Sequence, residues 1–261
     1  MKLEKVVEII EKIAPPELGA SWDNSGIQIN TGKKDIRNIL VCLDITDDVI
    51  DEAIDKNVDL IISHHPLLFV KPGKIDVEDV TGRYVIKLIK SDIAVYSAHI
   101  PFDSAPMGNN FYMAKLLGMT DVQEIEGEFG VTGTLEKPLA FLDAVKHVED
   151  SLKLPKYYVK AVGEEECKVE RIALCTGAGG EVLYSAKKEG CQMVVTGDVK
   201  HNVALDAKAM GICLVDAGHY GTEKIFAENF ISQMEEEFKH SDAEDVKVFE
   251  SQINTNPYVE L

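Results

Sequence analysis

The sequence predicts an α/β protein, because two series of buried-strand patterns alternate with helical patterns along the chain. The first series begins near residue 36 and the second near residue 172. Runs such as residues 39–43 and 212–216 are almost continuously apolar. Such runs are typical of parallel strands that helices cover on both faces. Alternating strands and helices therefore indicate parallel sheets rather than a sandwich or a bundle.

The first series follows an N-terminal helical pattern over residues 2–13, which stops before Pro15-Pro16. A strand at 26–30 precedes the series. The elements of the series are strands at 39–43, 60–63 and 93–97, and helices at 46–56, 84–90 and 111–117. Thr46 or Asp47 can cap the first of these helices. We expect the first domain to close near residue 125.

A different middle section and a second series complete the chain. The predicted elements are strands at 129–135, 157–162, 172–175, 191–196 and 212–216, and helices at 139–152, 201–210 and 219–239. A last strand near 246–250 is expected to return to the first domain. The predicted domains are therefore residues 1–126 plus about 240–261, and residues 127–239.

Composition narrows the classes of function. The 261 residues carry 45 acidic and 27 basic side chains, and the net charge of −18 argues against nucleic-acid binding. The five cysteines have no C-x-x-C spacing, so neither a disulfide framework nor a thiolate zinc site is indicated. No apolar run reaches the ~18 residues that span a bilayer, and the N-terminus lacks a signal-peptide pattern. We expect a soluble, reduced, cytoplasmic protein that does not bind membranes.

Two adjacent histidines, His64 and His65, follow the strand at 60–63 directly. For an arbitrary protein, an exposed histidine pair at a turn is the simpler interpretation. Pro66 keeps His65 out of the helical region, however, so the two side chains can flank one site at the end of the strand.

Further candidate metal ligands follow other strands. Asp103 lies beyond the strand at 93–97, and His219 follows the strand at 212–216, with Glu223 four residues later on the same helix face. The carboxyl edge of parallel strands is where α/β proteins place ligand sites. Five nitrogen and oxygen ligands exceed the three of one catalytic zinc. They suit two ions ~3.5–4 Å apart, in a cleft between the two domains. Zinc, manganese, iron, cobalt and nickel remain open.

Two other features allow two interpretations each. The turn Gly177–Gly180 opens a helix and can either bind an anion or permit tight packing of the helix on the sheet. Trp22, the only tryptophan, is either an anchor for its loop or a ligand contact.

Several motifs together are similar to one known family. They are Trp22-Asp23-Asn24, Ser63-His64-His65-Pro66, Ser97-Ala98-His99 with Asp103, the Gly177–Gly180 turn, Thr196-Gly197-Asp198, and Gly218-His219 with Glu223. These motifs occur in the order found in the Nif-three-like family, which the chain therefore resembles. Members of that family are commonly described as GTP cyclohydrolase 1 type 2 homologues. The resemblance implies two interlinked α/β domains, a toroidal homohexamer and a dinuclear metal centre.

The resemblance also implies roles for single residues. The implied metal ligands are His64, His65, Asp103, His219 and Glu223, with Glu223 as the bridge. The chain departs from the family pattern at Ile100-Pro101-Phe102, where members often have a polar Thr-Asn pair, and at Asn202, where many have a histidine. These departures bear on substrate recognition and leave the ligand set intact.

The expected chemistry is metal-dependent hydrolysis of a small molecule, with a nucleotide as the candidate substrate. In the cyclohydrolase interpretation, water activated by two cations attacks C8 of the guanine of GTP, and the opened ring loses formate. His99 is the candidate proton donor and His201 a second one, and each can instead orient a ligand. Two alternatives stay open: a phosphoesterase, and a non-catalytic protein for metal binding, metal delivery or regulatory interaction.

Overall fold

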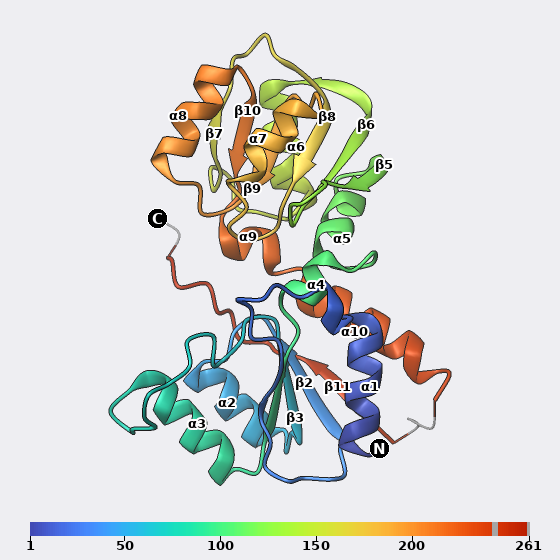
Figure 1. Ribbon diagram of the computed structural model, residues 1–261, viewed down its shortest axis with the longest axis vertical. Coiled ribbons are helices and arrows are strands. Elements are labelled where there is room, and N and C mark those ends of the chain that lie inside the picture. Colours follow the sequence, from blue (N-terminus) through green and yellow to red (C-terminus); the bar gives the residue numbers. More distant parts are fainter. Residues whose placement is uncertain (242–244, 260–261) are drawn as a thin grey trace. The chain divides into compact units, whose positions relative to one another are not determined.

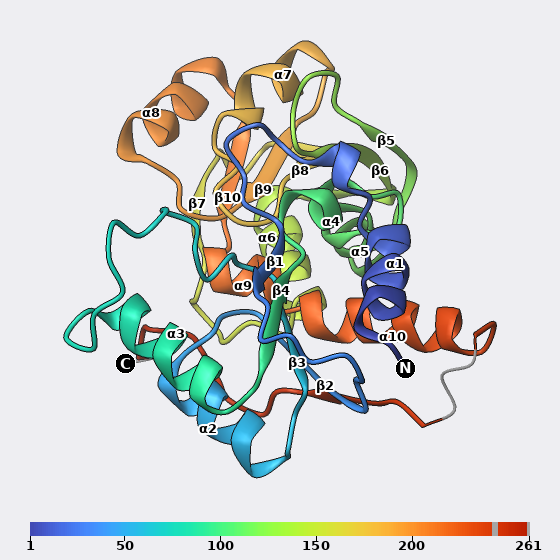
Figure 2. The same ribbon diagram turned by 60° about the horizontal axis from the view of Figure 1, so that its bottom comes forward.

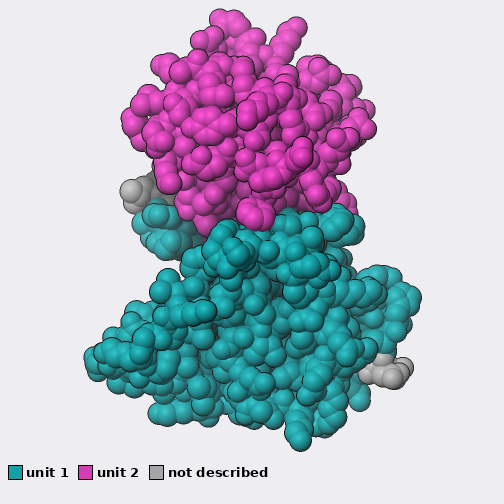
Figure 3. Space-filling model, in the orientation of Figure 1, with its two compact units in different colours: residues 1–108, 226–261 teal, residues 109–225 magenta. Residues whose placement is uncertain are grey.

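A computed structural model describes residues 1–241 and 245–259, and it shows an α/β protein with two sheets and helices packed against them (Figure 1). The chain forms two compact units, coloured separately in Figure 3. Unit 1 contains residues 1–108 and 226–261, and unit 2 contains residues 109–225. The chain therefore leaves unit 1, builds unit 2 and returns. Within the described residues, no helix has the length and apolar character needed to cross a membrane.

The sheet of unit 1 has the strand order β1-β4-β3-β2-β11. Four strands are parallel, β2 (Asn38–Cys42), β3 (Leu60–Ser63), β4 (Ala94–Ser97) and β11 (Lys247–Glu250), and β1 (Gly26–Ile29) runs antiparallel to β4. The last residues of the three central strands, Cys42, Ser63 and Ser97, are in register. The loops that follow them consequently start at one level on the carboxyl edge.

Helices cover both faces of this sheet, as Figures 1 and 2 show. Helices α2 (Asp47–Asp55) and α3 (Val80–Lys90) pack on one face, and α1 (Leu3–Ile13) and α10 (Phe226–Phe238) lie on the other. Thr46 caps α2 by accepting a hydrogen bond from the Val49 amide, and Asp79 caps α3 in the same way. Two short helices, η1 (Pro16–Leu18) and α4 (Ile100–Ser104), complete the unit.

The sheet of unit 2 has the order β5-β6-β8-β9-β10-β7. Its parallel centre is β8 (Lys168–Leu174), β9 (Met193–Thr196) and β10 (Cys213–Asp216), and β5 (Met119–Glu124), β6 (Val131–Ala140) and β7 (Lys160–Val162) pair antiparallel. Helices α5 (Asn109–Leu116) and α6 (Phe141–Ser151) pack on one face, α7 (Val182–Lys188) and α8 (His201–Met210) on the other, and α9 (His219–Glu223) follows β10.

The unit boundaries lie elsewhere than residues 126 and 240, where the sequence predicted them. Helix α5 and strand β5 belong to unit 2, because β5 pairs with β6. Helix α10 belongs to unit 1, where Phe226, Phe230 and Met234 are buried. The helix expected over 219–239 is accordingly two helices, α9 and α10, and the unit boundary falls between them. The returning last strand is confirmed, because β11 pairs parallel with β2.

Candidate metal centre

Three histidines meet at the carboxyl edge of the unit 1 sheet. His64 and His65 follow β3, and His99 follows β4. One ring nitrogen of each histidine lies within 4.8 Å of those of the other two. The backbone amides of His64 and His65 donate to the carbonyls of Cys42, the last residue of β2, and of Leu43, the residue after it. The predicted convergence of the two neighbours is present in the structure.

His64 is buried and its ring is fixed at one nitrogen. Its Nδ1 lies 2.9 Å from the carbonyl oxygen of Ala98. A carbonyl only accepts hydrogen bonds, so Nδ1 carries the proton and the lone pair is on Nε2. This Nε2 lies 3.6 Å from Oδ1 of Asp103, a buried residue of α4. Pro101 lies in the first turn of α4, where its missing amide hydrogen costs nothing.

His65 and His99 are fixed at Nδ1 by carboxylates. Nδ1 of His65 lies 2.7 Å from Oδ1 of Asp44, which follows β2. Nδ1 of His99 lies 2.8 Å from Oδ1 of Asp23. The Ser25 hydroxyl donates to the other Asp23 oxygen at 2.6 Å and accepts the His99 amide at 3.1 Å. Each neutral ring therefore carries its lone pair on Nε2.

The Asp23 carboxylate is kept ionised beside His99. Burial alone would raise the pKa of Asp23, but the hydrogen bonds from His99, Ser25 and the Asn24 amide and the charge interaction with His99 together outweigh burial. The pKa of Asp23 is therefore lowered from its ordinary value of 3.8. The ionised carboxylate fixes the His99 ring through Nδ1 and leaves Nε2 available.

Unit 2 carries a His–Glu pair on α9. His219 Nε2 lies 3.0 Å from Oε2 of the buried Glu223, four residues later. His219 Nδ1 lies 2.7 Å from Oδ2 of Asp198, in the loop after β9. Asp198 has a φ of 51°, a left-handed conformation that aspartate adopts more readily than most residues. Both residues of the pair were predicted as ligands from sequence.

The Gly177–Gly180 turn packs closely against this pair. Gly177 has a φ of +67°, and a Cβ there would lie 2.2 Å from Glu223 Oε1. The Gly177 amide donates to the Thr222 hydroxyl at 2.9 Å, and the Gly179 amide donates to the Thr196 hydroxyl at 2.8 Å. These amides hold the turn against its own unit. Of the two interpretations, the contacts favour close packing over an anion site.

The histidines described above share one pattern: Nδ1 is bonded to an oxygen of the protein, and the lone pair is on Nε2. They are His64, His65, His99 and His219. Metal-binding histidines are typically held in this way, because the bond at one nitrogen fixes the ring and makes the other more basic. In a tetrahedral site with bonds of ~2.0–2.1 Å, neighbouring donor atoms lie about 3.3 Å apart. The donor pairs within each unit, at 3.6 Å and 3.0 Å, are close to this value. The donor sets fit divalent transition metals.

Three carboxylates of this arrangement were not predicted from sequence: Asp23, Asp44 and Asp198. Asp44 and Asp198 are each the second residue after a parallel strand, which is a usable signal at a carboxyl edge. His201 is exposed at the start of α8, and Nδ1 of His219 contacts Asp198.

Trp22 is 56% exposed, so it does not anchor its loop in the core. Its ring meets the rings of Phe69 and His99 edge to face, with centroids 6.3 Å and 6.4 Å away. Phe69 is itself 49% exposed. Two exposed aromatic rings therefore flank His99.

Comparison with known proteins identifies the family. The sequence profile described as Duf34/NIF3 (NGG1p interacting factor 3) matches residues 1–257, and the chain belongs to this family. It is 35% identical over 230 residues to a GTP cyclohydrolase 1 type 2 homolog of Clostridium perfringens, covering 85% of this chain and 87% of the relative. It is 32% identical over 231 residues to the GTP cyclohydrolase 1 type 2 of Helicobacter pylori, covering 86% and 88%.

Solved structures share the fold. Staphylococcus aureus protein SA1388 superposes with a TM-score of 0.93 at 27% identity, over 100% of this chain and 99% of that one. A Bacillus cereus protein related to NIF3 also gives a TM-score of 0.93, at 23% identity and with the same coverage, which shows the common fold. The family and the α/β fold expected from sequence are thus confirmed.

Proposed function

We propose that this chain is a metal-dependent hydrolase of small molecules that uses two divalent transition-metal ions, with GTP cyclohydrolase as the candidate activity. The observation that carries the proposal is the common state of the four histidines, each held at Nδ1 by a protein oxygen with its lone pair on Nε2. The names of the relatives from Clostridium perfringens and Helicobacter pylori support the candidate activity.

Ligand count supports joint action of the two donor sets. Unit 1 offers His64, His65 and Asp103, whereas α9 offers His219 and Glu223. Two ligands alone are fewer than the three that a catalytic zinc ordinarily takes from protein. All five together suit two ions. In this proposal Glu223 would be the ligand shared by both ions, because a carboxylate has two oxygens to share and an imidazole has one lone pair.

The proposed chemistry divides between the ions and the protein. When bound, two such ions lower the pKa of water and so supply a nucleophile at neutral pH. His99 exchanges the proton with the substrate at Nε2, while Asp23 fixes the ring through Nδ1. Ser25 holds both the His99 amide and the Asp23 carboxylate, so it fixes their relative position.

The aromatic rings beside His99 support a planar substrate. Trp22 and Phe69 are about half exposed, and both meet His99 edge to face. Stacking of a nucleic-acid base on an aromatic side chain contributes about 1–3 kcal/mol. A purine ring bound on Trp22 would place its reacting carbon near the proton-exchanging imidazole.

Formate release from GTP tests the activity. We expect metal-dependent formate from the wild type, and a kcat about 10²–10⁴-fold lower in His99→Gln, the range that a general acid or base supplies. Trp22→Ala should raise KM more than it lowers kcat. His147→Gln is the matched control, because His147 bonds only the Leu117 carbonyl in the contacts described and should retain activity.

Other outcomes separate the alternatives. Hydrolysis of p-nitrophenyl phosphate without formate release would replace the cyclohydrolase by a phosphoesterase. A metal-loaded protein inactive on both substrates would contradict the hydrolase proposal and favour metal binding or delivery.

A further inference from the structure

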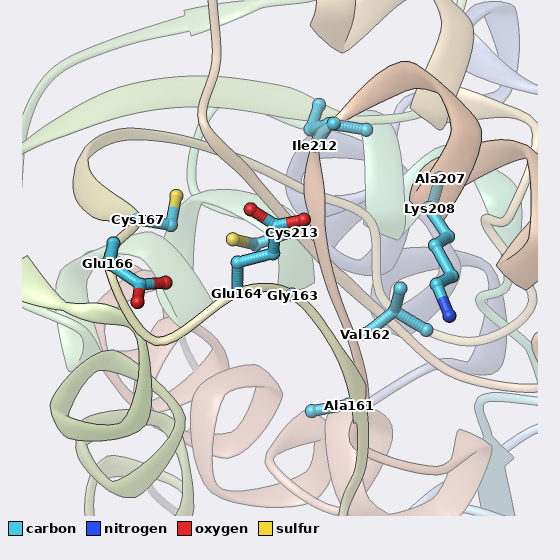
Figure 4. A pocket seen from close by; sticks show the side chains of 11 residues that line it. Ala161, Val162, Gly163, Glu164, Glu166, Cys167, Ala207, Lys208, Ile212 and Cys213 are labelled. Atoms are coloured by element: carbon cyan, nitrogen blue, oxygen red, sulfur yellow. The ribbon is translucent and has the colours of Figure 1, made fainter.

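A cavity of about 550 Å³ opens in unit 2, away from α9, and Figure 4 shows its lining. One wall is the turn between β7 and β8, with Glu164, Glu166 and Cys167. The other walls are the C-terminal part of α8, with Lys208, and the first residue of β10, Cys213. Two cysteines that are distant in sequence thus line one cavity. The proposed hydrolase does not use them.

The two thiols lie beside each other in the cavity, as Figure 4 shows. Cys167 is close enough to act on the pKa of the Cys213 thiol. Both side chains pack against the same apolar cluster, on the α6 face of the sheet. The Cys167 backbone is held by bonds to Phe141 and Glu164. The turn that carries Cys167 is therefore fixed beside the cavity that Cys213 also lines.

The two thiols differ in exposure. Cys213 is 2% exposed, whereas Cys167 is half-buried. Burial above all, and next the neighbouring Cys167 side chain, raise the pKa of Cys213 to about 12. An oxidant in the cavity therefore meets Cys167 first, and Cys213 is the protonated neighbour behind it.

The other cysteines lack this arrangement. Cys42, Cys175 and Cys191 are buried in apolar clusters and behave as small core side chains. Over the described residues, no group of three or more donors able to share a metal ion includes a cysteine. Redox chemistry rather than metal binding is the chemistry that this pair of thiols supports.

We propose that Cys167 and Cys213 form a reversible disulfide in this cavity, with a hydroperoxide as the oxidant. The Cys167 thiolate attacks one peroxide oxygen, the O–O bond breaks, and Cys167 becomes a sulfenic acid while hydroxide leaves. The Cys213 sulfur then attacks the Cys167 sulfur, the S–O bond breaks, and the second oxygen leaves as water. The two sulfurs lose two electrons, the peroxide gains them, and the thiol protons end in water.

Peptide mapping after limited peroxide treatment tests this proposal. The whole protein is treated with hydrogen peroxide, alkylated under denaturing conditions, digested and analysed by mass spectrometry. We expect a peptide linked through Cys167 and Cys213, a loss of two titratable thiols and 2 Da per chain, and full recovery with dithiothreitol. In Cys213→Ser, Cys167 should instead gain one or two oxygen atoms.

Matched variants keep the test decisive. Cys191→Ala removes a buried cysteine of the same unit, and the disulfide should still form. Cys167→Ser changes a half-buried turn residue, so the fold should survive while the linked peptide disappears. The proposal would be overturned if Cys167 and Cys213 both stayed reduced at a peroxide dose that oxidises glutathione. Linkage through another cysteine would overturn it as well.

Discussion

Each histidine of the candidate metal centre is oriented by an oxygen that the chain places behind it. For His65, His99 and His219 that oxygen belongs to a carboxylate. A carboxylate at Nδ1 holds the ring in place and makes Nε2 a stronger donor to a metal. Asp44 and Asp198, behind the proposed ligands His65 and His219, should therefore affect metal affinity without touching the metal.

Asp198→Asn tests this role for His219. The change removes the negative charge 2.7 Å from Nδ1, and we expect metal affinity to fall about 10–100-fold, as is typical for such partners. Competition with a chromophoric chelator measures the affinity. Asp206→Asn is the control, because Asp206 accepts a hydrogen bond from Tyr184 instead. Equal affinities of Asp198→Asn and wild type would show that the contact has no influence on metal binding.

Asp59 links stability to pH. Burial would raise its pKa, but the Lys33 ammonium and the Arg37 and Asn38 amides outweigh burial, and the pKa lies below the ordinary 3.8. A depressed folded-state pKa contributes stability above the unfolded-state pKa, and that contribution is lost as the pH falls through the folded-state value.

Asp59→Asn should therefore lower the free energy of unfolding by about 1–3 kcal/mol at pH 7. The difference from wild type should shrink as the pH falls below about 4. Urea unfolding at several pH values measures both effects. Asp92 also contacts Lys33 but is exposed, so Asp92→Asn should change the free energy of unfolding little. A pH-independent difference would contradict the proposed linkage.

At the scale of elements, the Gly177–Gly180 turn before α7 packs against the side chain of Glu223. A Cβ on Gly177 would lie 2.2 Å from Glu223 Oε1, and its positive φ disfavours any other residue. We expect Gly177→Ala to displace the Glu223 carboxylate and weaken metal binding at least as much as Asp198→Asn.

Gly180→Ala is the control in the same turn, because its Cβ would meet only Val203, at 3.5 Å. Isothermal titration with zinc compares the two variants, and circular dichroism verifies that both fold. Identical zinc binding in both would show that the turn does not support Glu223.

Elements with a strong apolar pattern were predictable, and polar ones were not. The buried strands β2, β3 and β10 follow their apolar runs, and Thr46 caps α2 as expected. Strand β5 was missed, because most of its side chains are exposed and its sequence, Met-Thr-Asp-Val-Gln-Glu, lacks a buried face. The break between α9 and α10 was missed because apolar residues continue through it at helical spacing.

The candidate ligands were predictable because they lie in the segments that follow strands, at the carboxyl edges of the sheets. His64, His65 and His219 stand at such positions, and the strands before them are parallel, as expected. Asp23 could not be assigned, because its contact with His99 joins residues 76 apart in the chain. Pairings of that kind depend on how loops from different strands meet, and local patterns do not encode it.

At the scale of the whole molecule, family resemblance predicts a toroidal homohexamer. We expect gel filtration with light scattering to give a particle about six times the 28.8 kDa mass of the chain. A particle of monomer mass at all concentrations would contradict the predicted assembly.

Metal content per chain is the most direct measurement of whether the five proposed ligands act together. The protein is purified without chelators, as wild type, as Glu223→Gln and as the control Glu228→Gln, whose side chain is on the exposed face of α10. We predict two transition-metal ions per chain in wild type and control, and fewer in Glu223→Gln. No stoichiometric metal in wild type, even after reconstitution with zinc, manganese, iron, cobalt or nickel, would contradict the dinuclear centre.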